Sequence, residues 1–361
     1  MTPARKTARA KALARAVGFD LVGVAPAQPL AGALYYKKWL ALGYGGSMGY
    51  LARDVETRVD PRRLLPGARS VICGAVRYRR ADGWELRRPG ASPAGLAGPS
   101  PLGRVAQYAR GRDYHRVLRR LFEALLDRLR AEWQEPFEAR VCVDSGPVLE
   151  RELAALAGLG WIGRNTCLLN ATHGSYLLLG EAVTTLELEP DEPVAERCGR
   201  CTRCLDACPT GALRAPGELD ARRCLAYLTI EHRGLIAEEF HAAQGHWVYG
   251  CDTCQQVCPY NARAPLGTQP DINADVLPAW LPLTDLSRLR ASAHRRLTRG
   301  TAAGRARAAA WRRNAVIALA NADELDPSAG AALAAATHDA DAAVRAAAAA
   351  GLRRRGRSVG R

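Results

Sequence analysis

The sequence predicts a multidomain protein of mixed α/β class, with an α/β domain first, a cysteine-rich domain second and an α-helical domain last. Candidate strands and helices alternate over residues 1–190. Eight of the eleven cysteines lie within 191–270, and 271–361 has a helical, alanine-rich pattern. Because 361 residues suffice for two or three domains, we take these three ranges as the predicted domains.

The first domain is predicted from hydrophobic patterns that alternate between strand and helix. In chain order we expect a helix over 5–17, strands within 20–26 and 65–76, a helix over 114–133, a strand that turns into a helix within 137–160, and a strand region at 175–188. Residues 88–103 are dense in proline and glycine and are expected to form a loop.

The last domain contains two similar segments, RNAVIALAN (313–321) and VRAAAAAGL (344–352), about 31 residues apart. A period of this length is typical of stacked helical repeats. Because there are only two copies, an alanine-rich helix without repetition is the alternative.

The composition indicates a cytoplasmic protein with no membrane partner. No apolar run approaches the roughly 20 residues that a membrane-spanning helix needs. The basic N-terminus lacks the apolar segment and the cleavage site of a secretory signal. In a reducing compartment, clustered cysteines are more often metal ligands than disulfides.

The cysteine pattern predicts a ferredoxin-like domain with two [4Fe–4S] clusters. In bacterial-type ferredoxins, three cysteines of C-x2-C-x2-C-x3-C-P bind one cluster and the fourth binds the other. By this rule the first cluster is bound by Cys198, Cys201, Cys204 and Cys258, and the second by Cys208, Cys224, Cys251 and Cys254. Zinc bound by four thiolates is the alternative, but the proline after both Cys208 and Cys258 favours clusters. The other cysteines, Cys73, Cys142 and Cys167, are expected to be buried small hydrophobes.

Asp144 lies between a predicted strand and a predicted helix, in RVCVDSGPVLERELA. Ligands of α/β domains bind at the carboxyl ends of strands. Locally, however, a helix-capping role is favoured, in which Asp144 or Ser145 accepts a backbone N–H. No G-x-G-x-x-G dinucleotide motif follows a strand. RDYHRVL contains the pattern Asp-x-His, which also occurs in corrinoid domains that bind cobalt through a histidine. The glycine that follows at a fixed spacing in those domains is missing here, so, if a corrinoid binds, we expect no protein histidine on its cobalt.

The chain has a net charge of +15, and one segment near the C-terminus is strongly basic. Between Leu286 and Asn314 there are nine arginines and no acidic residue. Such a cluster favours a surface that faces nucleic acid. The alternative is a compositional bias, since nearly all basic residues of the chain are arginine.

The chain resembles the epoxyqueuosine reductases, which complete queuosine synthesis on tRNA, over nearly its whole length. The motifs that carry the resemblance are GFDLVGVAPA, YARGRDYHRVLR (108–119), VDSGPVLERELA (143–154), GWIGRNTCLL (160–169), CGRCTRCLDACPTGAL, YLTIEHRG (227–234), GCDTCQQVCPYN (250–261) and RRNAVIALAN. The resemblance implies a cobalamin-binding first domain, two [4Fe–4S] clusters and a HEAT-like helical domain that binds tRNA.

The resemblance also implies the residues and partners of the reaction. Asp144 would be the general acid, and Arg58, Tyr108, Cys251 and Asp252 would lie near the cobalamin, which rests as cob(II)alamin and acts as Co(I). For Arg58 the alternative is an ordinary surface arginine, and for Tyr108 a packed aromatic at the start of a helix. The partners would be tRNA carrying epoxyqueuosine and an external electron donor of the flavodoxin or ferredoxin type, with the enzyme a monomer.

Removal of the epoxide oxygen consumes two electrons and two protons. An acid beside the cobalamin must hold a proton near neutral pH, so we expect burial to raise the pKa of Asp144. Three other functions would use parts of the same pattern: a corrinoid enzyme of the reductive dehalogenase type, a ferredoxin-type electron carrier, and an RNA-binding protein without redox activity.

Overall fold

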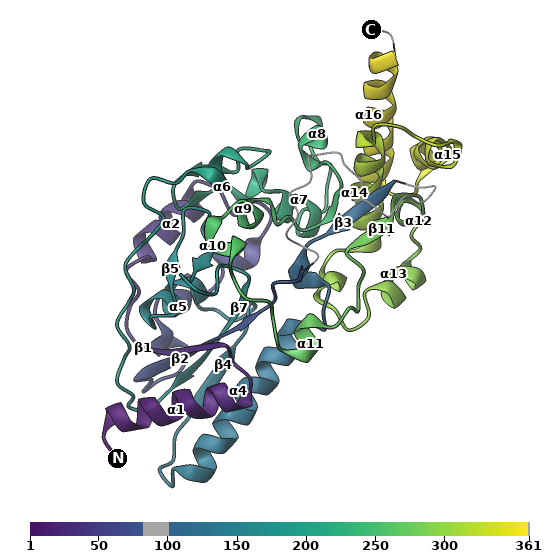
Figure 1. The fold of residues 1–361 in the computed structure, drawn as a ribbon. Helices are drawn as coiled ribbons and strands as arrows, with labels where there is room; N and C mark the ends of the chain where they lie inside the picture. The colour runs from purple at the N-terminus through teal and green to yellow at the C-terminus, as the bar shows by residue number, and fades with distance from the viewer. Residues whose placement is uncertain (82–100, 360–361) are drawn as a thin grey trace.

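The computed structural model describes residues 1–81 and 101–359, and Figure 1 shows their arrangement. The N-terminal part is built on a four-stranded sheet with the order β1, β2, β7, β4. These strands are β1 (Leu21–Pro26), β2 (Ser70–Arg77), β7 (Leu177–Thr184) and β4 (Ala139–Cys142). All three pairings in this sheet are antiparallel.

The antiparallel pairing corrects one of our expectations about Asp144. The rule that ligands bind at the carboxyl ends of strands applies to parallel sheets. Asp144 does follow an expected strand, β4, but β4 is at the edge of an antiparallel sheet. The position of this residue in a functional site must therefore come from its tertiary neighbours.

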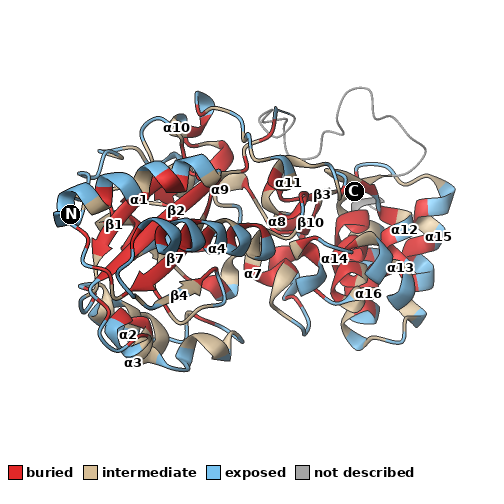
Figure 2. Ribbon diagram, turned by 90° about the horizontal axis from the view of Figure 1, so that it is seen from below, coloured by how far each residue is buried: buried red, intermediate tan, exposed pale blue. Residues whose placement is uncertain are grey.

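Helices cover both faces of this sheet. α1 (Pro3–Val17) and α4 (Tyr114–Glu132) pack on one face in a single buried cluster with β2 and β7. α5 (Glu150–Leu156) packs on the other face. Figure 2 shows the outer side of α4 exposed and the strands beneath it buried. The helices expected at 5–17 and 114–133 are confirmed as α1 and α4.

A second sheet joins distant parts of the chain. β3 (Leu102–Val105) pairs in parallel with β10 (Trp247–Tyr249) and antiparallel with β11 (Trp280–Pro282). It therefore links segments from all three predicted domains, whose boundaries remain a prediction. Of the loop expected at 88–103, residues 88–100 lie outside the described part of the chain. Leu102 and Gly103 belong to β3, so the loop was predicted too long.

The cysteine-rich part consists of short elements. They are α6 (Arg203–Asp206), β8 (Leu213–Ala215), β9 (Glu218–Leu219), α7 (Leu225–Ile230), α8 (His241–Gln244), α9 (Thr253–Gln256) and α10 (Pro259–Ala262). Each C-x2-C pair that begins at Cys201 or Cys251 leads into a one-turn helix, and these helices, α6 and α9, contact each other. The two halves of the motif are therefore neighbours in space.

The C-terminal part is helical, as expected. It contains α12 (Leu283–Ser287), α13 (Ala291–Leu297), α14 (Ala308–Asn321), α15 (Pro327–Ala335) and α16 (Ala342–Val359). The two similar segments fall on α14 and α16, which pack against each other. A Cβ added at Gly351 of α16 would lie 2.6 Å from the Cβ of Ala320 on α14, so the small residue allows the close crossing.

Several short elements complete the fold. They are α2 (Ala33–Ala41), α3 (Val55–Arg58), β5 (Trp161–Ile162), β6 (Leu168–Leu169) and α11 (Pro270–Asn273), together with 3-10 turns at Gly49–Ala52, Pro61–Arg63, Gln107–Ala109, Ala221–Arg223, Glu238–Phe240, Ala302–Arg305 and Ala336–His338. Among the described helices, none is both long and apolar enough to cross a membrane.

Candidate functional site

A cavity of about 810 Å³ is lined by side chains from all three predicted domains. Asp144, His115 and Arg58 come from the first domain, Cys224 from the cysteine-rich part and Arg305 from the helical part. A second cavity, of about 590 Å³, shares Arg58 and Asp144 with the first. The first cavity by itself lies in the upper part of the usual range for ligand pockets, about 300–1,000 Å³.

Asp144 lies in this cavity as part of a hydrogen-bonded row. His115 Nε2 is 3.0 Å from a carboxylate oxygen of Asp144, and His115 Nδ1 is 2.7 Å from the carboxylate of Asp113. Asp113 also caps α4 by accepting the backbone N–H of His115. The imidazole therefore bridges two carboxylates, and the side chain of Asp144 is 56% exposed toward the cavity.

The capping role that the local sequence favoured for Asp144 and Ser145 is wrong. The N-cap position of α5 is Leu149, which makes no side-chain cap bond. Instead, Asp144 donates its backbone N–H to the side chain of Glu150 and has a left-handed backbone with φ of 56°. This conformation is uncommon for a residue with a Cβ, so the loop is held in place by its surroundings.

The expectation that the pKa of Asp144 is raised is also wrong. Burial alone would raise it, but the hydrogen bond and positive charge of His115, with Tyr114 and Arg305, lower the pKa of Asp144. Conversely, burial would lower the pKa of His115, but the hydrogen bonds and charges of Asp113 and Asp144 raise it to about 9. At neutral pH the proton of this pair therefore resides on the imidazole.

Arg58 is not an ordinary surface arginine. Its side chain is buried and donates hydrogen bonds to three backbone oxygens, those of Arg53, Gly146 and Tyr50. One of these acceptors, Gly146, belongs to the loop that carries Asp144. Arg58 thereby ties this loop to the turn at Tyr50, on the wall of the same cavity.

Tyr108 is both a packed aromatic and a cavity residue. It lies in the 3-10 turn Gln107–Ala109, and its ring is 6.1 Å from that of Tyr114 and 6.2 Å from that of Tyr249. All three tyrosines line the cavity. They give it an apolar, aromatic wall, which suits a flat macrocyclic ligand.

Cys251 and Asp252 lie behind this wall and are absent from the described cavity lining. The Asp252 carboxylate is buried and accepts the backbone N–H of Gln107 at 2.9 Å, and burial raises its pKa to about 6. Asp252 therefore holds the turn next to Tyr108. Cys251 donates to the Thr253 hydroxyl and lies near Cys224, which does line the cavity.

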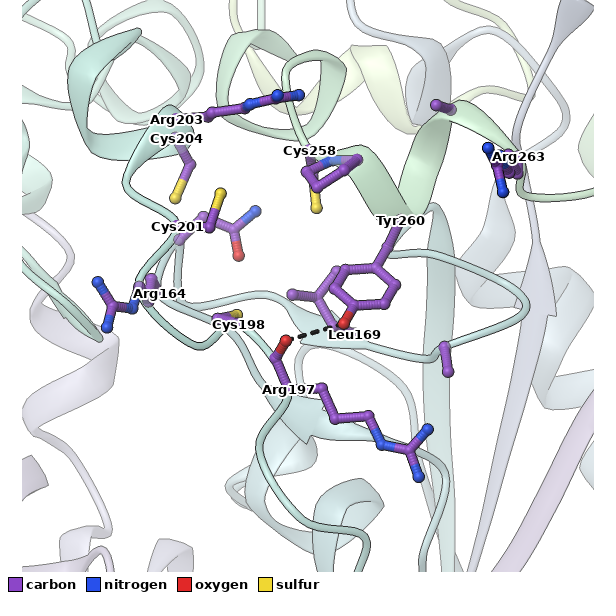
Figure 3. A pocket seen from close by; sticks show the side chains of 14 residues that line it. Arg164, Leu169, Arg197, Cys198, Cys201, Arg203, Cys204, Cys258, Tyr260 and Arg263 are labelled. Atoms are coloured by element: carbon purple, nitrogen blue, oxygen red, sulfur yellow. Dashed lines mark hydrogen bonds between the residues drawn. The ribbon is translucent and has the colours of Figure 1, made fainter.

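The structure brings the first four predicted ligands together. Cys198, Cys201, Cys204 and Cys258 line one cavity of about 600 Å³, and Figure 3 shows their sulfur atoms facing a common space. The Trp161 indole N–H is 3.4 Å from the sulfur of Cys198. Four thiols around one space are the donor set that a [4Fe–4S] cluster needs.

The other four predicted ligands are also neighbours. The thiols of Cys208, Cys224, Cys251 and Cys254 interact electrostatically with one another, and the backbone N–H of Ala212 is 3.3 Å from the sulfur of Cys208. Cys167, which we expected to be a small hydrophobe, forms a side-chain hydrogen bond with Cys254. The second group therefore borders the 810 Å³ cavity, because its Cys224 lines that cavity.

The arginine cluster between Leu286 and Asn314 is only partly a free surface. Arg305 pairs with Glu231 through two contacts of 2.8 and 2.9 Å, Arg312 pairs with Asp339, and Arg313 is 1% exposed. Arg305 is exposed but paired, and the other exposed arginines of the segment are Arg288, Arg290, Arg295, Arg296, Arg299 and Arg307. The predicted basic surface thus retains two thirds of its charges.

Two groups of four thiols, one of them beside a cavity that holds a histidine–carboxylate pair, define a class of oxidoreductase with a 4Fe–4S double-cluster domain. The family model "4Fe-4S double cluster binding domain" matches residues 197–261, and "Epoxyqueuosine reductase QueG, DUF1730" matches 58–145. The chain is 41% identical to the epoxyqueuosine reductase of Xanthomonas campestris, over 84% of this chain and 87% of the relative. It belongs to the epoxyqueuosine reductase family.

Other relatives and solved structures agree. The epoxyqueuosine reductase of Gloeobacter violaceus is 43% identical over 86% of this chain and 95% of its own. The crystal structure of an epoxyqueuosine reductase with an epoxyqueuosine-modified tRNA-Tyr stem loop matches with a TM-score of 0.85 and 32% identity, over 96% of this chain and 88% of that one. A Bacillus subtilis structure, solved with its catalytic aspartate loop swung out of the active site, matches with a TM-score of 0.83 and 31% identity, over 96% and 89%. The resemblance seen in the sequence is confirmed.

The sequence reasoning missed the role of His115. The Asp-x-His of RDYHRVL was considered only as a source of a cobalt ligand. The motif itself could have indicated this role. Asp113 is a typical N-cap residue, and an N-cap carboxylate two residues before a histidine can hold the imidazole at the start of the helix. That the imidazole also meets Asp144, 29 residues further along, is visible only in three dimensions.

Proposed function

We propose that this oxidoreductase reduces epoxyqueuosine to queuosine at the wobble position of tRNA, with cobalamin in the 810 Å³ cavity and electrons from two [4Fe–4S] clusters. One observation carries the proposal. A thiol of the second cysteine group, Cys224, and the His115–Asp144 pair line the same cavity. A ligand in this cavity can therefore receive electrons from the side of Cys224 and protons from the side of the His115–Asp144 pair.

The residues of the cavity suit a cobalamin. The three tyrosines and Met48 offer an apolar wall, and Arg58 fixes the loop of Asp144 beside it. When bound, cobalamin supplies a low-valent cobalt that is a strong nucleophile toward an epoxide carbon. Tyr108, Arg58 and Asp144 would hold it from the first domain, and Cys251 with Asp252 would support the wall from behind.

The His115–Asp144 pair supplies the proton. Ring opening of an epoxide leaves an alkoxide, which is far more basic than imidazole or carboxylate. The carboxylate of Asp144 can take the proton of the His115 imidazolium and pass it to that oxygen, while Asp113 stabilises the charge on the ring. A second proton, passed through the same pair after solvent has reprotonated the imidazole, lets the oxygen leave as water. Asp144 is thus the proposed proton donor and His115 the store of its proton.

The basic helical part is proposed to position the tRNA. Phosphate contacts fix the register of an RNA, and the chemistry needs one base turned out of its stack. Apart from Arg305, the six exposed arginines between Leu286 and Asn314 can supply the first. The proposal includes a HEAT-like arrangement of α14 and α16, action as a monomer in the cytoplasm, and an external electron donor.

The experiment that tests the function is anaerobic incubation of the protein, loaded with clusters and cobalamin, with tRNA that contains epoxyqueuosine and with dithionite. Digestion to nucleosides and mass spectrometry should show that the modified nucleoside loses one oxygen. No change with fully loaded protein would refute the proposal. Asp144→Asn is the matched variant, and it should abolish turnover while both clusters remain visible in the absorption spectrum.

A further inference from the structure

Four arginines surround the cavity of the first cysteine group. They are Arg164, Arg197, Arg203 and Arg263. Figure 3 shows the guanidinium groups of Arg164, Arg197 and Arg263 directed away from the sulfur atoms, and the side chain of Arg203 running along the edge of the cavity toward the loop of Cys258. Arg197, Arg203 and Arg263 are exposed, and we call these three residues the arginine rim.

The charges of the arginine rim are not neutralised inside the molecule. Within residues 1–81 and 101–359, none of the three forms an ion pair with a carboxylate, and the described lining of the cavity contains no Asp or Glu. Two carboxylates close in sequence, Glu196 and Asp206, accept the N–H of Cys198 and the Thr202 hydroxyl and form no ion pair with the rim among the described residues. Exposed like charges around one opening produce a local positive potential that attracts an acidic partner.

The geometry argues against a role confined to the cluster itself. An arginine that neutralised thiolate sulfur would direct its N–H groups inward. Arg164 is tied to the backbone oxygen of Gly199, but the side chains of Arg197 and Arg263 point away from the sulfur atoms. A shallow hollow of about 510 Å³ adjoins the opening, so the surface beside the thiols is concave; its lining includes Arg203, Cys258 and Pro259 and one carboxylate, that of Asp206.

The arginine rim is separate from the substrate cavity. The described linings of the two cavities have no residue in common, and Cys224 of the second cysteine group is the thiol that borders the substrate cavity. The exposed arginines proposed to meet tRNA lie on the helical part, beyond residue 286. The position of the rim therefore favours a partner that supplies electrons to the first cysteine group over the tRNA that carries the modified base.

We propose that the arginine rim is the docking surface for an acidic, one-electron carrier protein. The inference deepens the proposed function and rests on its order of electron flow. In each encounter the carrier is oxidised by one electron and the first cluster is reduced by one. Two encounters supply the two electrons of the reduction. Only electrons pass between the two proteins at the rim, and no covalent bond forms or breaks there.

The test uses the full-length protein with both clusters and a purified acidic bacterial flavodoxin in its hydroquinone form. The variant carries Arg197→Gln, Arg203→Gln and Arg263→Gln. Its matched control carries Arg5→Gln, Arg15→Gln and Arg128→Gln, three exposed arginines of α1 and α4 with the same total change in charge. Stopped-flow absorbance measures cluster reduction, and isothermal titration measures binding of the flavodoxin.

The rim variant should lose about tenfold or more in the second-order rate of reduction by flavodoxin at low salt, and its rate should depend less on ionic strength. Its reduction by dithionite and its affinity for epoxyqueuosine tRNA should match those of the control. Equal flavodoxin rates in both variants would overturn the proposal. So would a loss of tRNA affinity, which would mark an RNA surface, or slower reduction by dithionite, which would mark a role in supporting the cluster.

These readouts separate the two proposals. Cluster reduction and flavodoxin binding need neither cobalamin nor tRNA. If the protein accepts electrons through the rim but does not convert the tRNA with any reductant, the docking surface stands and the proposed function fails.

Discussion

At the scale of single residues, the neighbours of Asp144 and His115 determine which of the two side chains carries a proton at neutral pH. Asp144 is exposed in the cavity and its pKa is lowered, so on its own it would be ionised at neutral pH. His115, between Asp113 and Asp144, keeps its proton up to a pKa of about 9. The acid of this site is therefore a pair, and its pH range is set by the imidazole.

His115→Asn should test this assignment. Asparagine keeps a hydrogen-bonding group near Asp113 but cannot carry the proton, so single-turnover reduction at pH 7 should slow by about 100-fold or more. In the wild-type protein the rate should fall as the pH rises through about 9, because the raised pKa of His115 marks where the proton is lost. The variant should lack this alkaline limb.

The control for that experiment is Glu123→Gln, a change at an exposed position of α4. It should keep both the rate and the pH profile. A His115→Asn protein with the wild-type alkaline limb would show that another group supplies the proton.

Glu181 is a second residue whose environment sets its charge. It is fully buried on β7, with Cys73 and Cys142 as its partners on the two neighbouring strands, and neither carboxylate oxygen has a hydrogen-bond partner among the described residues. Burial, followed by the charges of Glu150 and Asp144, raises its pKa. Folding therefore requires Glu181 to keep a proton that it would lose in the unfolded chain at neutral pH.

This predicts a specific pH dependence of stability. A raised pKa of an acid in the folded state means that stability falls as the pH rises above the ordinary glutamate value, about 4.3. Glu181→Gln removes that titration, so its melting temperature, relative to wild type, should be higher at pH 8 than at pH 5. Glu187→Gln, an exposed position that pairs with Arg69, should show no such trend. A parallel pH dependence in wild type and Glu181→Gln would contradict the assignment.

At the scale of elements, α14 organises the region behind the cavity. Arg313 lies within α14 at 1% exposure and donates to the backbone oxygens of Leu228, His232 and Gly234. These oxygens belong to the end of α7 and the turn that follows it. That segment also carries Glu231, the ion-pair partner of Arg305 on the cavity wall.

Arg313→Met should therefore destabilise the protein much more than a surface change. Methionine can fill the volume but leaves the buried carbonyl of Leu228 and the partly buried carbonyls of His232 and Gly234 without this donor. A buried acceptor left without a donor costs about 1–3 kcal/mol. We expect a clear fall in melting temperature and less restraint of the turn that carries Glu231, the partner of Arg305. Arg353→Met, which breaks an exposed pair with Glu238, should cost at most about 1 kcal/mol. Equal melting temperatures for the two variants would show that the carbonyls find other donors.

The sequence predicted local features better than partnerships across the fold. Helices α1 and α4 follow from apolar spacing over many turns, and the cysteine groups follow from a spacing that is itself the binding rule. The antiparallel order of the sheet does not follow, because alternating strands and helices are compatible with either direction. The sign of the pKa shift at Asp144 was missed because it depends on His115, which approaches from another element.

At the scale of the whole molecule, the grouping of the cysteines along the proposed electron path differs from their order in the sequence. Cys258 belongs to the second cysteine motif in the sequence but lines the cavity of Cys198, Cys201 and Cys204. Cys208 belongs to the first motif, yet its neighbour is Cys224, a thiol of the second group that lines the 810 Å³ cavity. In the proposed ligand assignment the two motifs thus exchange one cysteine each, so each cluster would need both motifs in place.

This exchange predicts different losses from two similar substitutions. Cys258→Ser should remove the outer cluster, and Cys208→Ser the inner one, each with about four of the eight irons. Electron paramagnetic resonance of the reduced proteins should show a different surviving signal in each. Reduction by flavodoxin should be slow in Cys258→Ser but remain fast in Cys208→Ser, because electrons enter at the outer cluster. Turnover should be lost in Cys208→Ser even with dithionite, since the cluster beside the cavity is missing. If Cys208→Ser lost the same signal as Cys198→Ser, each motif would bind its own cluster and the exchange of ligands would be wrong.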